Sequence, residues 1–322
     1  MERKLKAILK LVSESSAPVG SAELAKKLKA MGIDLSERTV RYHLKNMGEE
    51  GLLKVFWKEG RMITSKGQAE LDDSLVSEKV GLMSSRIANM AYKMDFDLYK
   101  KGGSVILNVS LFIKKDFAKA LEIMAPVFKK KLTTGELVAV AKAGEKLGEF
   151  LVPDDKIAFG TLCIVNLNGI LLKHAIPVES IFGGVLQMEN GKPLRFTDMI
   201  NYSGSTLDPH LVFMRSKMTN VQQACNGAGK ILAGLREIPA VSANEAEAII
   251  RKIESAGIGH ALMIGKTGQA ILGMPVKMDR VGIVVPGGLN PIAAVEEAGI
   301  ETQTSALGAL VSYERLQKFS TI

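Results

Sequence analysis

The residue types best suited to binding a polyanion occur in a short run near the N-terminus. Between Ser36 and Met47, the apolar residues Val40, Leu44 and Met47 recur at the spacing of one helix face. Ser36 precedes them and can accept hydrogen bonds from the first free N–H groups of that helix. Guanidinium, ammonium and hydroxyl groups off the apolar face can bind DNA phosphates and base edges. The DNA-binding residues that we predict, two of them in a following hairpin, are Ser36, Arg38, Thr39, Arg41, Tyr42, Lys45, Lys58 and Arg61.

A second candidate site lies in two loops that each join an expected strand to an expected helix. In the later loop, Gly287 and Gly288 lead to Asn290, which we expect to cap the helix. Such a junction presents unpaired backbone N–H groups and the positive end of a helix dipole, which favour a carboxylate or phosphate. The earlier loop, Gly160 to Cys163, adds the hydroxyl of Thr161 and a thiol. Both loops are therefore candidates for binding a small anion.

Polar residues between these loops extend the candidate site. The stretch Asn201 to His210 is dense in short polar side chains, and Arg236 is the cation best suited to bidentate recognition of a carboxylate. The effector-binding residues that we predict are Gly160, Thr161, Cys163, Thr206, Asp208, Arg236, Gly287 and Gly288. The alternatives are ordinary strand-to-helix turns at the glycines, a surface turn before His210, and a salt bridge at Arg236.

Spacing argues against several other chemistries. Gly265-Lys266-Thr267 resembles the end of a P-loop, but His260 stands where the first glycine is required. Cys163 and Cys225 show no paired spacing, so neither a disulfide framework nor a zinc site is indicated. The four histidines fall in no metal or nucleophile spacing, and Asp208 with His210 lacks an orienting third group. We therefore predict a protein that is not an enzyme and holds no metal and no cofactor besides an effector.

The elements that position the first group of residues form a winged helix-turn-helix over residues 1–72. Apolar spacing predicts helices over 5–12, 22–31 and 37–47. Two strands over 52–57 and 61–64 follow, separated by turn residues, and read as a two-stranded wing. We expect a connecting segment over 73–101 that is helical from Leu75 to Lys93.

The second group of residues lies in a region, 102–322, where β-rich runs alternate with helical runs, which predicts an α/β or α+β domain. Sliding this region by 124 positions superposes Asn166 on Asn290 and gives eight identities in 45 aligned positions. We interpret this as an internal duplication, with related halves at about 104–188 and 229–313. Two such halves would place their loops about a pseudo-twofold axis, where a cleft could bind a ligand.

Composition agrees with a soluble binding protein. The chain has 322 residues, 47 % hydrophobic content, a formal charge of +8 and a pI near 9.3, which allow two or three domains and a polyanionic partner. Lysines interrupt the N-terminal apolar run, and no window is apolar enough to span a membrane. We expect a cytoplasmic protein without a membrane partner.

Several separated motifs, in order behind the expected winged helix, resemble the NrpR family of archaeal repressors of nitrogen-assimilation genes. The resemblance covers nearly the whole chain. It rests on four segments, which are Gly160 to Cys163, Tyr202 to Pro209, Met218 to Val221 and Arg236 to Ala240.

The resemblance implies a homodimer that binds a palindromic DNA operator and leaves it when 2-oxoglutarate accumulates. That dicarboxylate would suit the anion-binding loops. Longer members of the family carry two regulatory domains in tandem, whereas this chain has room for one, so a companion chain with a second regulatory domain is a possible partner.

Three other functions stay open from the sequence. The winged helix could contact proteins rather than DNA, with its charges solvated. The regulator could answer a different small anionic metabolite, because the loops argue only for negative charge. An enzyme fused to a DNA-binding module is the least favoured, since it would require turnover dependent on Asp208 or His210.

Overall fold

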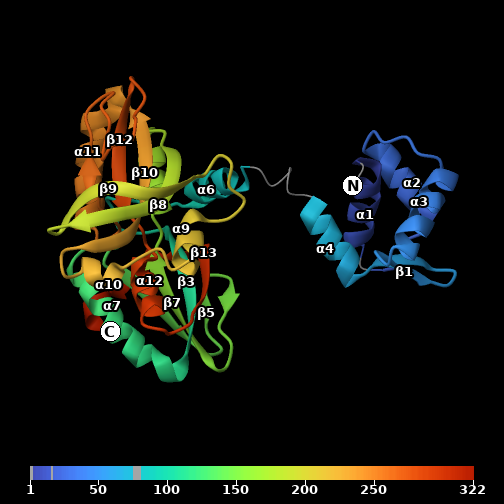
Figure 1. The fold of residues 1–322 in the computed structure, drawn as a ribbon, viewed down its shortest axis with the longest axis horizontal. Coiled ribbons are helices and arrows are strands. Elements are labelled where there is room, and N and C mark those ends of the chain that lie inside the picture. The colour runs from blue at the N-terminus through green and yellow to red at the C-terminus, as the bar shows by residue number, and fades with distance from the viewer. Residues whose placement is uncertain (1–2, 16, 75–80) are drawn as a thin grey trace. The chain divides into compact units, whose positions relative to one another are not determined.

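The computed structural model describes residues 3–15, 17–74 and 81–322, and the chain divides into two compact units, 1–80 and 81–322 (Figure 1). Residues 75–80 of the predicted connecting helix lie outside the described residues. The described remainder, α6 (Leu82–Lys93), is helical and packs on α8 (Val165–Lys173) within the second unit.

The first unit is a winged helix, as predicted. Its elements are α1 (Arg3–Ser13), α2 (Ser21–Ala30), α3 (Glu37–Glu49), β1 (Leu53–Phe56), β2 (Gly60–Ile63) and α4 (Ser65–Ser74). The apolar faces expected from the sequence meet in one core, where Ile8, Leu24, Val40 and Leu44 are fully buried. Strands β1 and β2 pair antiparallel, and Arg61 also pairs with Val19 through backbone hydrogen bonds. This pairing anchors the wing to the helical core.

The second unit contains two five-stranded sheets built from a repeated order of elements. The first half holds β3 (Ser104–Ile113), α7 (Phe117–Lys129), β4 (Leu137–Lys142), β5 (Lys146–Leu147), β6 (Phe150–Leu151), β7 (Lys156–Leu162), α8 and β8 (Glu179–Glu189). The second half holds β10 (Gly229–Pro239), α11 (Ala243–Ser255), β11 (Met263–Ile264), β12 (Arg280–Pro286), α12 (Asn290–Glu297) and β13 (Gln303–Ser312). Between and after the halves lie β9 (Lys192–Asn201), α9 (Pro209–Arg215), α10 (Val221–Ala224) and β14 (Gln317–Lys318).

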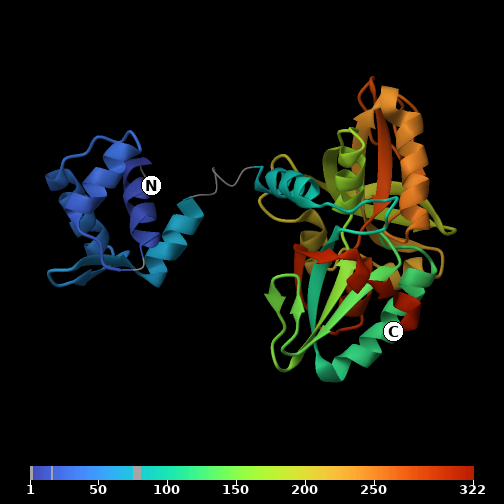
Figure 2. The same cartoon turned by 180° about the vertical axis from the view of Figure 1, so that it is seen from behind.

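Each half gives its last strand to the sheet of the other half. The strand orders are β13-β3-β7-β4-β14 and β11-β12-β10-β8-β9, with antiparallel pairing throughout these ladders. Figure 1 places β10 and β12 in the upper part of this unit and β3 and β7 in the lower part. Figure 2 shows α11, in orange, beside the upper strands and α7, in green, by the lower ones. The exchange ties the halves into one folded body.

Two asparagines at corresponding positions each hydrogen-bond a strand-to-helix loop to the neighbouring strand. The Asn166 side chain accepts from the N–H of Ile106 at 2.8 Å and donates to its carbonyl at 2.7 Å. Asn290 does the same with Leu232, at 2.7 and 2.9 Å. The prediction that Asn290 caps α12 is therefore wrong, because its side chain serves β10 and Leu289 occupies the N-cap position.

No helix among the described residues is long and apolar enough to cross a membrane.

Candidate DNA-binding surface and effector site

The N-terminus of α3 has the cap that the sequence predicts. Ser36 Oγ accepts from the N–H of Thr39 at 3.2 Å, and the hydroxyls of Ser36 and Thr39 lie 2.8 Å apart. This arrangement satisfies one of the N–H groups that a helix start leaves unpaired. It fixes the point at which α3 begins and hence the direction of every side chain that follows.

The cations of α3 lie on the face opposite its buried residues. Val40, Leu44 and Met47 are buried, whereas Arg38, Arg41, Tyr42 and Lys45 are exposed. The Arg41 side chain is 65 % exposed and pairs with Glu37, and the Lys45 side chain is 72 % exposed and lies 3.6 Å from Glu49. Exposed pairs of this kind contribute little, about 0–1 kcal/mol, so phosphates can replace the carboxylates as partners.

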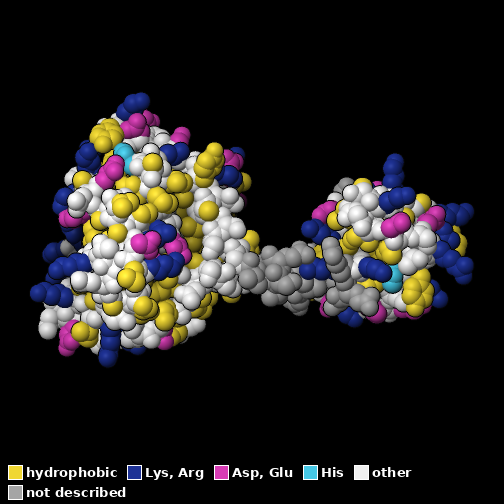
Figure 3. Space-filling view, turned by 90° about the horizontal axis from the view of Figure 1, so that it is seen from above, with side chains coloured by type: hydrophobic (Ala, Val, Ile, Leu, Met, Phe, Trp, Pro, Cys, Tyr) yellow, Lys and Arg dark blue, Asp and Glu magenta, His cyan; other side chains and the backbone are white. Residues whose placement is uncertain are grey.

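The two predicted wing residues differ in their surroundings. Lys58 is exposed at the turn between β1 and β2, with φ of 63°. Arg61 is half-buried on β2, and its Nε is buried without a hydrogen-bond partner among the described residues. Figure 3 shows Lys and Arg side chains spread over the visible surface of the winged helix. Lys58 is thus available to a polyanion, and Arg61 is held closer to the wing itself.

In the second unit, the most unusual predicted residue is Arg236, on β10. Its side chain is fully buried, Nη1 donates a hydrogen bond to the carbonyl of Leu235 at 3.2 Å, and the guanidinium also hydrogen-bonds with the Tyr202 hydroxyl. Nε and Nη2 have no partner among the described residues, and no ion pair is found there for this guanidinium. The ring of Tyr202 lies 5.3 Å from its central carbon. A buried cation with no direct ion pair is costly, so this position is a candidate site for an anion.

Residues from three segments surround this guanidinium. The charges of Arg236 and Asp208 both act on Cys163, Tyr202 and His210, so these five side chains form one cluster. Burial raises the pKa of the Cys163 thiol and that of the Tyr202 hydroxyl, each to about 12, so both are protonated at neutral pH.

The remaining members of the cluster are also uncharged or already bonded. Burial lowers the pKa of His210, which makes the ring neutral at neutral pH, and its Nε2 lies 3.1 Å from the carbonyl oxygen of Ala233. Asp208 caps α9, accepting from the N–H of Leu211 at 3.0 Å. Arg236 therefore carries the positive charge of this cluster.

The duplication provides a counterpart that lacks the cation. Arg236 lies opposite Ser180 of β8, whose hydroxyl accepts from Asn168 Nδ2 at 2.9 Å, while Oδ1 of that asparagine is buried without a partner among the described residues. In the other sheet, Ser110 of β3 lies opposite Thr304 of β13, and their hydroxyls bond at 2.8 Å. Of these two strand-pair positions, the one at Arg236 and Ser180 therefore has unpaired polar atoms beside it, whereas the hydroxyls at Ser110 and Thr304 satisfy each other.

The glycines predicted to approach an anion are instead packed against protein. A Cβ at Gly288 would lie 1.9 Å from the carbonyl oxygen of Leu162, and one at Gly287 would lie 2.7 Å from Leu232 Cβ. The N–H of Gly287 donates to the carbonyl of Leu232 at 2.8 Å. Gly287 thus packs within the second half and Gly288 packs against the first half, and protein atoms occupy the side of each glycine on which a Cβ would lie.

The other predicted residues lie apart from Arg236 or at the edge of its cluster. Gly160 and Thr161 are buried on β7, in the other sheet, and the Thr161 hydroxyl has no partner among the described residues. Thr206 is half-buried in the loop before Asp208. The structure therefore brings together Cys163, Asp208 and Arg236.

Four residues of this site escaped the sequence prediction. Tyr202 and His210 belong to the polar stretch that drew attention, but nothing in the sequence assigned them to Arg236. Asn168 and Ser180 carry no sequence signal, because strand exchange between the halves decides their position.

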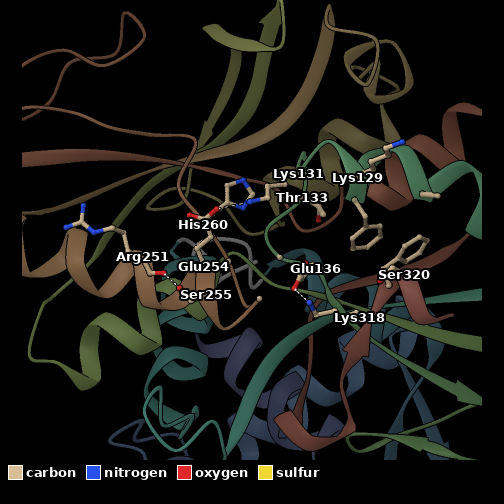
Figure 4. A pocket seen from close by; sticks show the side chains of 16 residues that line it. Lys129, Lys131, Thr133, Glu136, Arg251, Glu254, Ser255, His260, Lys318 and Ser320 are labelled. Atoms are coloured by element: carbon tan, nitrogen blue, oxygen red, sulfur yellow. Dashed lines mark hydrogen bonds and ion pairs between the residues drawn. The ribbon is translucent and has the colours of Figure 1, made fainter.

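A cavity of about 950 Å³ opens elsewhere in this unit, between the C-terminal ends of α7 and α11 and the last residues of the chain (Figure 4). It contains none of the predicted effector residues. Its lysines are partly neutralised, with Lys131 3.0 Å from Glu254 and Lys318 3.1 Å from Glu136. Among the described residues, no group of His, Cys, Asp and Glu could hold a metal ion.

Comparison with known proteins identifies both units. Residues 80–318 match the family described as NrpR regulatory domains NRD1 and 2, and residues 6–71 match the Ribonuclease R winged-helix domain. The first match covers more than half of the chain. The chain belongs to the NrpR family. The family resemblance of the sequence motifs is thereby confirmed.

Relatives within the NrpR family extend along the whole chain. The Global nitrogen regulator NrpRI of Methanosarcina mazei is 35 % identical over 99 % of this chain and 98 % of its own length. The Global nitrogen regulator NrpR of Methanococcus maripaludis is 30 % identical over 97 % of this chain, which spans 54 % of that relative. A crystal structure of a nitrogen repressor-like protein from Methanococcus jannaschii is similar with a TM-score of 0.61 and 29 % identity, over 73 % of this chain and 97 % of that one.

Proposed function

We propose that this NrpR-family chain is a transcriptional repressor of nitrogen-assimilation genes that binds a palindromic DNA operator through its winged helix. The observation that carries the proposal is the capped helix α3, whose cations are exposed on one face while its apolar residues are buried. Arg38, Arg41 and Lys45 can then reach base edges and phosphates in a major groove. The names of the relatives, all nitrogen regulators, support the same function.

We further propose that 2-oxoglutarate is the effector and that one of its carboxylates binds Arg236. Nε and Nη2 lie on one edge of the guanidinium, which matches the two oxygens of a carboxylate. Both nitrogens are buried and lack partners among the described residues, so an arriving carboxylate would satisfy donors that are now unpaired. Because Ser110 and Thr304 already satisfy each other at the counterpart position, we expect one effector per chain.

The effector can release DNA only if it binds the DNA-free conformation more tightly than the DNA-bound one. As a homodimer, the protein would have to present two copies of α3 to half-sites one helical turn, or a multiple of it, apart. A small change in the spacing of the copies would then lose contacts at one half-site. Full repression could also involve a companion chain that carries a second regulatory domain.

The DNA-binding part is tested by selecting duplexes from a random-sequence pool with the full chain and measuring affinity by fluorescence anisotropy. The proposal expects selected half-sites related by a twofold axis and a marked loss of affinity when Arg38 and Arg41 are changed to Ala. A matched control is Arg251→Ala, because Arg251 is an exposed arginine paired with Glu247 in the second unit. Failure to select any duplex would overturn the proposal.

A regulator of a different small anion is the second candidate, and one observation favours keeping it. The guanidinium edge of Arg236 recognises a carboxylate but does not by itself distinguish 2-oxoglutarate from other carboxylates. Calorimetry with 2-oxoglutarate, glutamate, succinate and oxaloacetate separates the two, since our proposal expects the first to bind most tightly.

A further inference from the structure

The wing carries an exposed tryptophan, and the proposed contacts of the cationic residues with DNA do not account for its exposure. Trp57 is the single tryptophan of the chain, and it is 84 % exposed at the turn that follows β1. An indole is a large apolar surface, and leaving it in water is unfavourable. Its position therefore calls for a partner outside the winged helix.

The wing holds Trp57 at a fixed place rather than on a loose loop. The ladder between β1 and β2 ends at the pair Phe56 and Gly60, and the N–H of Glu59 donates to the carbonyl of Phe56 at 3.1 Å. Gly60 has φ of 134°, and a Cβ there would lie 2.4 Å from the carbonyl oxygen of Val19. The turn thus requires glycine at this position and packs closely against the helical core.

Charges around the indole indicate the chemistry of its partner. Lys54 and Lys58 are exposed on the hairpin, and Lys54 Nζ lies 5.5 Å from the ring of Phe56. Glu59 is the acid of the turn. A partner that offers anionic groups beside apolar faces suits this combination, and the sugar-phosphate edge of a DNA groove has both. A uniformly acidic protein surface would pair with the lysines but would offer the indole no apolar contact.

We propose that Trp57 is a DNA-contacting residue, with its indole against deoxyribose and base edges in the groove next to the one that α3 enters. Lys58 then lies on a flanking phosphate. The inference rests on the proposed DNA-binding function and adds an aromatic contact to it. Removing a large apolar side chain from water on binding commonly changes affinity by about tenfold or more.

The single tryptophan makes the test specific. The full chain is titrated with a duplex that it has itself selected, while dye anisotropy reports DNA binding and tryptophan emission with iodide quenching reports the indole. We expect binding to shift the emission and to reduce iodide quenching at least twofold. We also expect Trp57→Ala to weaken binding about tenfold, with Trp57→Phe weakening it less because a large apolar ring remains.

Controls separate the possible failures. Tyr92→Ala removes an aromatic side chain that is 76 % exposed in the second unit and should leave DNA affinity unchanged. If anisotropy reports binding while the indole stays as accessible to iodide as in the free chain, the inference is overturned and the DNA-binding proposal stands. If the emission instead shifts with protein concentration alone, in step with a rise in mass by light scattering, a second copy occupies the wing and the inference is likewise overturned. If no duplex binds, both proposals fail.

Discussion

Replacing Arg236 by Met should stabilise the effector-free chain, although the replaced side chain is fully buried. Two nitrogens of the guanidinium, Nε and Nη2, lack partners among the described residues, and each such unsatisfied buried donor atom costs about 1–3 kcal/mol. The bond from Nη1 to Leu235 and the contact with the Tyr202 ring offset part of this, by about 2–4 kcal/mol together. The net gain that we expect is about 1–2 kcal/mol, in line with apolar replacements of buried charges.

Urea unfolding followed by circular dichroism measures this change, and hydrogen exchange of the β10 amides reports it locally. The same variant should lose the effector response, whereas a hundredfold excess of ligand over its Kd stabilises the wild-type chain by about 2.7 kcal/mol. Arg251→Met, at an exposed and paired arginine, is the matched control and should change neither quantity. The reasoning is refuted if Arg236→Met is destabilised by several kcal/mol, or if it is still stabilised by 2-oxoglutarate.

Three further outcomes follow from the same contacts. Changing Arg41 to Ala should weaken operator binding by about 1–3 kcal/mol if it reads a base, whereas a flatter dependence of affinity on salt would assign it to a phosphate. Burial lowers the pKa of His210 below its usual 6.5, so the unfolded chain binds more protons than the folded chain, and the free energy of unfolding should fall as pH drops below about 6.5. His210→Gln should reduce this dependence of the free energy of unfolding on pH. If the dependence is unchanged, it arises from other groups, such as the partly buried His260. Gly288→Ala should unfold the second unit at markedly lower urea, because its Cβ would meet the carbonyl of Leu162, and a wild-type midpoint would show that the loop can move.

Features that depend on neighbouring residues in the sequence could be predicted. The cap at Ser36 and the apolar spacing of α3 follow from local hydrogen bonding and helix periodicity, and both are confirmed. The winged helix and the mixed α/β class follow in the same way from the order of helical and strand-like runs.

Features that depend on contacts between residues distant in the sequence could not be predicted. Gly287 and Gly288 suggested an approach for a ligand, but the residue that approaches is Leu162 or Leu232 of the protein itself. Asn290 suggested a cap, but a more distant backbone, that of Leu232, binds its side chain. A short motif does not reveal which distant residues it will contact after the chain folds.

The role of Arg236 could be predicted only in part. Its residue type suggested a carboxylate site, and the alternative from the sequence was a salt bridge. The structure contains no such pair among its described residues, and the side chains of Cys163, Tyr202 and His210 near the guanidinium are neutral. The sequence could not show that Arg236 lacks an ion pair, because it does not reveal that the carboxylate of Asp208, which acts on the same neighbours, caps α9 instead.

The central claim is that a carboxylate at Arg236 controls the affinity of the winged helix for DNA. It is tested most directly by measuring the Kd for a selected operator duplex with and without saturating 2-oxoglutarate, for the wild-type chain and for Arg236→Gln side by side. Allosteric coupling of about 1–3 kcal/mol predicts an increase in Kd of about 5- to 150-fold for the wild type and none for the variant, with equal affinity in the absence of effector. An equal response of both chains, or no response of the wild type, would contradict the account.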